Sequence, residues 1–386
     1  MSNVIPLRRG IRVDSSREPS HAHPPSALLS DGLDTLMVGG ASVIVFLILQ
    51  ALYTVMGWPT PTWMGTALLA LSVAIAYPHF LLSYQLLYSD YRNKAFRQRQ
   101  FVLVSVVVPL ALIALLSVGF FGQNLVVLEW LVAAMYTLVG WHYVKQIYGV
   151  MVVIGARRGY SLSQKERSFL RGHLYLLWVT ALLPRHTRDW VPPRMTSVTH
   201  DFYGIRRIGL SLPPALLWLT YGLVLVSFFG LAFLCWRRYR EGKGMPPRSF
   251  LVAYLSGLLW QLPLFWYPEF LVMIPIFHGL QYWLFVLTFK KNETRARLEK
   301  SGSSTREKLW LSMVGYFGLA VVLGAVGFEL LPRLLNHVAG HGAWNTNGLS
   351  FVLPFWLFLN LHHYFIDSVL WKGSYPEIRA YLLSQR

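Results

Sequence analysis

The chain has almost no cysteine, because Cys235 is the single one among 386 residues. One cysteine excludes an intramolecular disulfide and any metal site built from several thiolates. Three common motifs are also missing: G-x-x-x-x-G-K-[ST], G-x-G-x-x-G between a strand and a helix, and H-E-x-x-H. The chain therefore has no standard phosphate-binding loop and no standard zinc-protease site.

Charged residues are scarce as well. They make up 13% of the chain, whereas soluble domains carry about 25%, and 54% of the residues are hydrophobic. The net charge of +18 comes from Lys and Arg that cluster in short stretches between apolar runs. Such clusters are typical of cytoplasmic loops that face anionic lipids. We therefore expect a membrane protein that contacts membrane lipids, and we expect no binding to nucleic acid.

Apolar runs long enough to span a bilayer as helices recur throughout the chain. They predict an all-α fold, a polytopic integral membrane helical bundle of about ten transmembrane helices. The first thirty residues are polar and no small-residue cleavage site follows the first run, which therefore predicts a retained anchor and not a signal peptide. The predicted spans are 34–57, 64–88, 101–121, 125–152, 169–184, 212–236, 249–266, 269–289, 309–331 and 350–371.

Orientation follows from the charge of the loops. Lys and Arg gather after the second, fourth, sixth and eighth spans, so both termini are expected in the cytoplasm, in a bacterial cytoplasmic (inner) membrane. The loop at 185–207 is an exception, because it carries five arginines on the predicted outer face. The predicted organisation is a disordered basic cytoplasmic tail at 1–33, the bundle at 34–371 and a short cytoplasmic segment at 372–386.

Four predicted spans carry a histidine near the middle of the membrane, namely His79, His142, His278 and His363, whereas His173 of the fifth span is expected at the interface. All four spans run from outside to inside, and their histidines lie about eight to eleven residues before the inner end, or ~12–17 Å deep. An ionisable residue inside a membrane marks a functional site by default. Helical bundles build metal sites from side chains on facing helices. We therefore predict these four histidines as metal ligands.

His362 directly precedes His363, and adjacent residues on a helix point about 100° apart. One of the two therefore faces a shared centre more easily than the other. Asp367 follows His363 by four residues, which places it on the same helix face. This spacing favours His363, while His362 stays a candidate ligand that could reach a second partner.

Polar residues also follow two of the other histidines at helical spacing. Gln146 comes four residues after His142, and Tyr282 comes four residues after His278, next to Gln281. Metal-bound histidines usually give their second ring N–H to a carboxylate, a carbonyl or water. These three side chains, like Asp367, are therefore predicted to orient the histidines.

Charged and aromatic side chains complete the predicted site. Lys145 and Asp367 lie about one turn below the histidines, so we expect an ion pair between the fourth and tenth spans. Trp141 flanks His142 and could line an apolar substrate or porphyrin pocket. We predict a catalytic group of Asp367, Lys145 and Tyr282, and cofactor contacts from Trp141, Gln146 and Gln281.

The general plan, with histidines near helix ends inside a hydrophobic bundle, resembles the integral-membrane non-haem iron hydroxylases and desaturases. Those enzymes carry H-x-x-x-H and H-x-x-H-H boxes, and none of the four histidine-bearing spans contains one. The resemblance therefore covers the architecture of the site, implies iron as a cofactor and assigns no family.

The sequence favours an inner-membrane, histidine-ligated metal protein, acting as an oxidoreductase or oxygenase on a lipophilic substrate or on electrons of the quinone pool. Non-haem iron and haem b are the expected cofactors, and imidazole also suits other transition metals. One alternative is a metal-free proton-coupled transporter, because His, Asp and Lys at the midplane also form proton relays. The other is a structural or assembly subunit that binds further subunits of a membrane complex.

Overall fold

A computed structural model describes eight stretches of the chain. Most of the predicted tail (1–26), the basic loop at 90–97 and part of the outer loop (192–200) lie outside them. The described residues are 27–55, 57, 63–89, 98–191, 201–206, 208–302, 304–340 and 348–383.

Seven helical segments are long and apolar enough to cross a membrane. Apart from one small hairpin, β1 (Asp201–Phe202) paired with β2 (Ile205–Arg206), the regular structure of the described residues is helical, which confirms the all-α, membrane-type fold. The full number of spans and the orientation stay predictions. The seven segments are α1 (Asp31–Thr35) with η1 (Leu36–Gly40) and α2 (Ala41–Val55); α3 (Met64–Leu71) with η2 (Ser72–Ala76) and α4 (Tyr77–Ser89); α6 (Arg99–Val102) with η3 (Leu103–Val107) and α7 (Val108–Phe120); α8 (Leu125–Arg157); α10 (Pro214–Arg240); α12 (Pro268–Lys300); and α13 (Arg306–Ala325) with η6 (Val326–Leu330) and α14 (Leu331–Gly340).

Three predicted spans are not among these seven. Helices α9 (Gln164–Leu182) and α15 (Val352–Leu370) have 19 residues each but are less apolar. Helix α11 (Arg248–Gln261) has 14 residues and gives way to the 3-10 turn η5 (Pro263–Phe265), because a proline disfavours helical backbone in the residue before it. The predicted span at 249–266 is therefore not one continuous helix.

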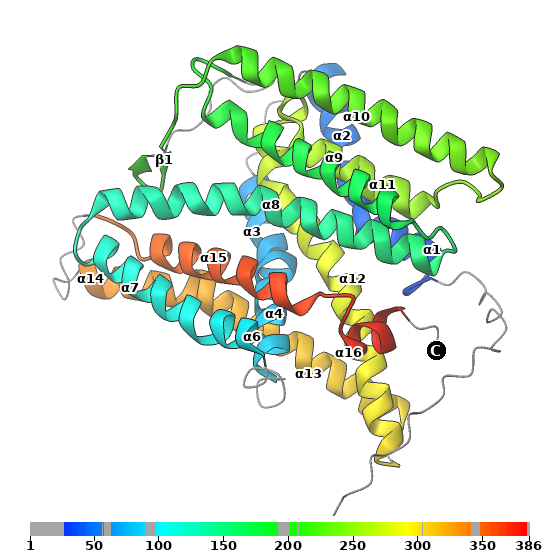
Figure 1. The fold of residues 1–386 in the computed structure, drawn as a ribbon. Helices are drawn as coiled ribbons and strands as arrows, with labels where there is room; N and C mark the ends of the chain where they lie inside the picture. The colour runs from blue at the N-terminus through cyan, green and yellow to red at the C-terminus, as the bar shows by residue number, and fades with distance from the viewer. Residues whose placement is uncertain are drawn as a thin grey trace, which may run out of the picture.

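Four helices carry the histidines predicted as ligands: α8 and α15 lie side by side and run in the same direction, and α4 and α12 cross them. Figure 1 shows α15 beside α8, both rising in residue number toward the same side. Along α15, rising residue numbers are matched by rising residue numbers on each of the other three helices, in direct contacts and in shared hydrophobic clusters. These are Trp356 with Tyr77 of α4, Leu357 with Leu131 of α8, Leu359 with Ile276 of α12, His362 with Tyr84 of α4, and Asp367 with His142 of α8 and Tyr282 of α12.

The π-helical segments η2 and η3, and the segment η1 with its kink at Gly39, supply backbone carbonyls that accept hydrogen bonds from side chains of other helices. A π turn breaks the regular i→i−4 ladder, and such turns are frequent at functional sites. In lipid every backbone polar group must be satisfied within the protein. Side chains of α12 and α15 donate to these carbonyls and so lock the two helices to the first three membrane segments. The bonds run from Gln281 Nε2 to Val38 O, from Trp283 Nε1 to Ile75 O at 3.1 Å, and from His362 Nε2 to Val104 O at 2.8 Å.

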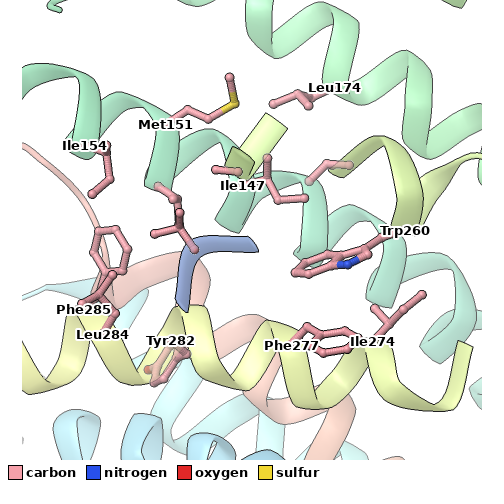
Figure 2. Packing of buried hydrophobic residues seen from close by; sticks show 14 of the residues in the cluster. Ile147, Met151, Ile154, Leu174, Trp260, Ile274, Phe277, Tyr282, Leu284 and Phe285 are labelled. Carbon is pink, nitrogen blue, oxygen red and sulfur yellow. The ribbon is translucent and has the colours of Figure 1, made fainter. Parts of the chain in front are cut away.

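The main core lies where α8, α11 and α12 meet. In a bilayer such contacts stabilise through van der Waals packing, because lipid is as apolar as the side chains. The core thereby fixes α8 relative to α12, the helices that carry His142 and His278. Figure 2 shows Ile154 of α8 above Phe285 of α12, Trp260 of α11 between Ile147 of α8 and Phe277 of α12, and Met151 beside Leu174 of α9.

Both ends of the described chain are tied to α8. Arg157, at the end of this helix, donates to the carbonyl oxygens of Ala27 at 2.9 Å and Leu382 at 3.1 Å. The segment predicted as a short cytoplasmic end therefore folds back onto the bundle. The remaining elements are η4 (Leu183–Arg185), α16 (Pro376–Ile378) and η7 (Arg379–Leu383).

A buried ion pair joins α9 to α10, and its removal should destabilise the protein. Arg238 Nη1 lies 2.7 Å from Glu166 Oε2, and both residues are 5% exposed. Burial raises the pKa of Glu166, but hydrogen bonds from Ser163 and Arg238 outweigh this effect and lower the pKa. Arg238→Ala leaves this buried carboxylate with only the longer ion pair to Arg237 Nη2 at 3.7 Å, so the free energy of unfolding should fall by up to about 3–5 kcal/mol. Unfolding in detergent measures this free energy. As a control, Arg240→Ala on the exposed face should change the free energy of unfolding by less than about 0.5 kcal/mol. Equal losses in the two variants would contradict the prediction.

Candidate metal centre

Four histidine rings from four helices meet inside the bundle. His79 of α4, His142 of α8, His278 of α12 and His363 of α15 are all buried, none more than 4% exposed. Their ring centroids form a closed cycle, with 5.0 Å from His79 to His278, 4.7 Å from His278 to His142, 4.8 Å from His142 to His363 and 4.9 Å from His363 to His79. The histidines predicted from their depth thus lie together, and their role as ligands is still a prediction.

Two of the rings are held through their Nδ1 atoms. His79 Nδ1 bonds to the carbonyl oxygen of Ala76, which accepts only, so this nitrogen carries the proton. His363 Nδ1 lies 2.8 Å from Ser83 Oγ, whose own proton goes to the carbonyl of Phe80 at 2.6 Å. Ser83 therefore accepts from His363. Both histidines consequently present an unprotonated Nε2, the form in which imidazole binds metals.

The Nε2 atoms converge at His142. Its Nε2 lies 3.0 Å from His278 Nε2 and 3.2 Å from His363 Nε2. A proton on His142 Nε2 can point at one of these two neighbours, so the other contact is left without a good hydrogen bond. A cation bound between the rings would satisfy the lone pairs together. Imidazole nitrogens bind a zinc-sized ion at ~2.0–2.1 Å, which places neighbouring nitrogens about 2.9–3.4 Å apart, and both measured distances fall in this range.

A carboxylate adjoins the rings on one side. Asp367 Oδ2 lies 3.6 Å from His363 Nε2 and 3.8 Å from His142 Nε2, and these groups could share a metal ion. Tyr282 donates its hydroxyl proton to Asp367 Oδ1 at 3.1 Å and accepts from Trp371 Nε1 at 3.3 Å. Asp367 therefore faces the metal-binding edge of His363, not the outer N–H that it was expected to accept. It is a candidate oxygen ligand that Tyr282 orients.

His362 points away from the cluster. Its Nε2 donates to the carbonyl of Val104 at 2.8 Å, and its Nδ1 accepts from the Tyr84 hydroxyl at 2.8 Å. Both ring nitrogens are therefore used in contacts between helices. The roughly 100° between adjacent helical residues separates His362 from His363, and we leave His362 out of the candidate ligand set.

The expected ion pair between Lys145 and Asp367 does not form. Lys145 Nζ lies 4.2 Å from the centroid of the Trp141 ring, and the basic groups found within ion-pair distance of Asp367 are His142 and His363. The cation–π contact stabilises the Lys145 ammonium away from the carboxylate. Trp141 is thereby placed against Lys145, so its predicted contact with a cofactor gains no support.

The two glutamines hold backbone, not rings. Gln146 Nε2 donates to the carbonyl of His278 at 2.9 Å and to Gln281 Oε1 at 3.1 Å. Gln281 Nε2 continues the chain to the carbonyl of Val38. The glutamines therefore position α12 at His278 and have no hydrogen bond to a histidine ring among the described residues.

Sequence reasoning missed Ser83, which fixes the ring of His363. The signal was present, because Ser83 follows His79 by four residues and so shares its helix face. Ser83→Ala should weaken metal binding about 10–100-fold, as loss of an outer partner of a ligand does. Ser256 is a matched control, since it is buried and donates to its own i−3 carbonyl at 2.8 Å, as Ser83 does. Metal titration of both alanine variants tests this, and equal affinities would remove Ser83 from the site.

The donors form two overlapping groups that could hold a metal ion, His79 with His278 and His363, and His142 with His363 and Asp367, and they do not fit haem. A haem iron offers its two axial positions to the protein, since the porphyrin occupies the others. Here each of the four rings contacts two others in a closed cycle, so a porphyrin plane cannot pass between any opposed pair. Three or four imidazoles with one carboxylate suit iron, copper, zinc or nickel.

Comparison with known proteins adds no assignment. No family model, no curated protein and no solved structure matches the chain. The site is therefore interpreted from its own geometry.

Proposed function

We propose that this protein is a membrane metalloprotein that binds one transition-metal ion through His79, His142, His278 and His363, with Asp367 as an oxygen ligand. The observation that carries the proposal is the convergence of three Nε2 atoms at 3.0 and 3.2 Å in a buried, membrane-type bundle. Isolated histidines in membrane helices serve well as single interhelical donors. Four of them with facing ring nitrogens are better explained by a shared cation.

We further propose an oxidoreductase or oxygenase that acts on a lipophilic substrate or on quinone-pool electrons in the bacterial cytoplasmic membrane. An iron or copper ion would supply electron transfer or oxygen chemistry there. The protein would contribute a dry, apolar shell, ring orientation through Ser83 and Ala76, and the Asp367 carboxylate held by Tyr282. The clusters of basic residues after α8, α10 and α12 support a cytoplasmic location of these helix ends.

Elemental analysis of protein purified in detergent tests the proposal. We expect a stoichiometric transition metal, which a chelator removes and which titration restores. Protein that neither contains such a metal nor takes one up from iron, copper, manganese or zinc salts would overturn the metal assignment. If the site accepts zinc alone, the protein is still a metalloprotein, but the proposal of an oxidoreductase is wrong.

A further inference from the structure

A cavity of about 420 Å³ lies next to the histidine cluster, although none of the four histidines lines it. Two of its wall residues, Tyr143 and Tyr364, are also neighbours of the cluster. The Tyr143 ring lies 4.7 Å from the His278 ring, and the Tyr364 ring lies 4.9 Å from the His142 ring. One layer of aromatic rings therefore separates the cavity from the candidate ligands.

The cavity lies on the N-terminal side of the histidines along α8, α12 and α15. Its walls come from Met135–Tyr143 of α8, Pro268–Pro275 of α12 and Trp356–Tyr364 of α15. Among them Val272 is 55% exposed, so the cavity reaches the surface near the start of α12. The opposite side of the cluster is filled by the hydrogen-bonded chain of Asp367, Tyr282 and Trp371. Access to the centre therefore comes from the N-terminal side.

Eight of the residues that line the cavity are aromatic, and a few polar groups stand among them. Cavities of this size with mostly apolar walls and few polar groups are typical of small-molecule sites. Arg185, at the end of η4, lines the same cavity, and its guanidinium lies 4.3 Å from the Tyr136 ring. Tyr136 precedes His142 by six residues, so the cationic group lies about 9 Å along α8 from the histidine level.

A larger cavity, about 710 Å³, lies between α9, α10 and α11 and has a different character. It is lined by residues such as Leu170, Phe228 and Tyr254, and its lining includes neither Tyr143 nor Tyr364, the two residues that link the smaller cavity to the cluster. A molecule bound there would have no path to the candidate ligands through a shared wall.

We propose that the 420 Å³ cavity is the substrate pocket of the metal centre and binds an amphipathic lipophilic anion. The apolar body of the ligand packs against the aromatic walls, and its acidic head group pairs with Arg185. The membrane delivers the molecule through the opening at Val272. This inference rests on the proposed function for its metal centre, although the binding step itself needs no metal.

Binding of cis-parinaric acid, a fluorescent polyene fatty acid, tests the pocket through energy transfer from the cavity tryptophans. Arg185→Gln should weaken binding about 10–100-fold, the effect of losing one charge-assisted hydrogen bond. Arg188→Gln removes the same charge from an exposed neighbouring position and should leave the affinity unchanged. The alcohol of the same chain should bind the unmodified protein as weakly as the acid binds Arg185→Gln. Equal affinity for acid and alcohol would overturn the acidic class of ligand.

A second pair of variants tests the location. Val139→Phe fills the cavity from α8 and should abolish saturable binding, whereas Val126→Phe on the same helix is 60% exposed and should not. If both variants bind the probe like the unmodified protein, the ligand sits elsewhere and the proposal fails.

The link to the metal centre has its own readout. Protein loaded with Co²⁺ should change its visible absorption when the fatty acid binds, and His363→Ala should bind the fatty acid but show no such bands. If the protein binds the probe but contains no stoichiometric metal, the proposed function is wrong and the cavity is still a lipid-binding pocket. Protein that binds Co²⁺ with no spectral response to bound probe would overturn the assignment of this cavity to the centre.

Discussion

Replacing His142 by alanine should remove metal from the histidine cluster. His142 Nε2 is the atom that two other ring nitrogens approach, at 3.0 and 3.2 Å, and the Asp367 carboxylate lies 3.8 Å away. Loss of an outer partner of a ligand costs about 10–100-fold in affinity, so loss of this central ligand should cost at least about 100-fold. Elemental analysis and metal titration of the purified variant measure this.

His362→Ala is the matched control, because His362 is also buried and adjoins His363 on α15. It leaves the Val104 carbonyl and the Tyr84 hydroxyl without their partner, so it should cost about 1–3 kcal/mol of stability for each unsatisfied group. Its metal content should equal that of the unmodified protein. If His362→Ala loses as much metal as His142→Ala, the loss reflects general destabilisation and the ligand assignment is wrong.

The meeting of the four histidines could be predicted because the expected level and direction of each one depend on one helix at a time, while their membrane depth and orientation stay predictions. The apolar run fixes where a helix lies in the membrane, and the charge of the following loop fixes its direction. His79, His142, His278 and His363 then fall at one depth whatever the packing. The choice of His363 over its neighbour also followed from local spacing, since Asp367 lies one turn further on the same face and does approach the His363 ring.

The hydrogen-bond partners could not be predicted, because they depend on how each helix is rotated against another. Gln146 is one turn from His142, yet its amide reaches across to the His278 carbonyl on α12. Ser83 lies on α4 and serves a histidine of α15. The π segments η2 and η3 add to the difficulty, since each inserts one residue and turns the following helix by about 100° relative to a regular 3.6-residue pattern, and η1 adds a kink at Gly39.

The short α11 has a similar explanation. The apolar run at 249–266 is long enough for a span, but Pro263 ends the helix and turns the chain into η5. The length of the apolar run therefore predicted a longer helix than the one that forms. The weakly apolar α9 and α15 show the converse, because buried polar residues such as Asn360, His362 and His363 lower the hydropathy of a helix that packs at the centre of the bundle.

Gly324→Leu should weaken metal binding from outside the cluster. A Cβ atom at Gly324 of α13 would lie 3.0 Å from the Tyr77 backbone carbon and 3.1 Å from the Pro78 nitrogen, both in the first turn of α4. Real Cβ atoms seldom approach backbone this closely, so α13 and α4 must separate, and such overpacking typically costs about 1–3 kcal/mol. His79 is the next residue of α4, so its ring should move with the helix and metal affinity should fall at least about tenfold.

Gly318→Leu on the same helix separates this effect from the properties of leucine. A Cβ atom at Gly318 has no neighbour within 4 Å, and leucine is a better helix former than glycine, which costs about 0.8–1.0 kcal/mol relative to alanine. Gly318→Leu should therefore keep both stability and metal affinity. Unfolding curves and metal titrations of the two variants distinguish the outcomes: a Gly324→Leu protein that is less stable but binds metal normally would show that α13 supports the bundle without positioning His79. The expected result is that Gly324→Leu lowers both the stability and the metal affinity. Metal added at concentrations below the new dissociation constant should not restore binding. This result would tie the close approach of α13 and α4 to the geometry of the centre.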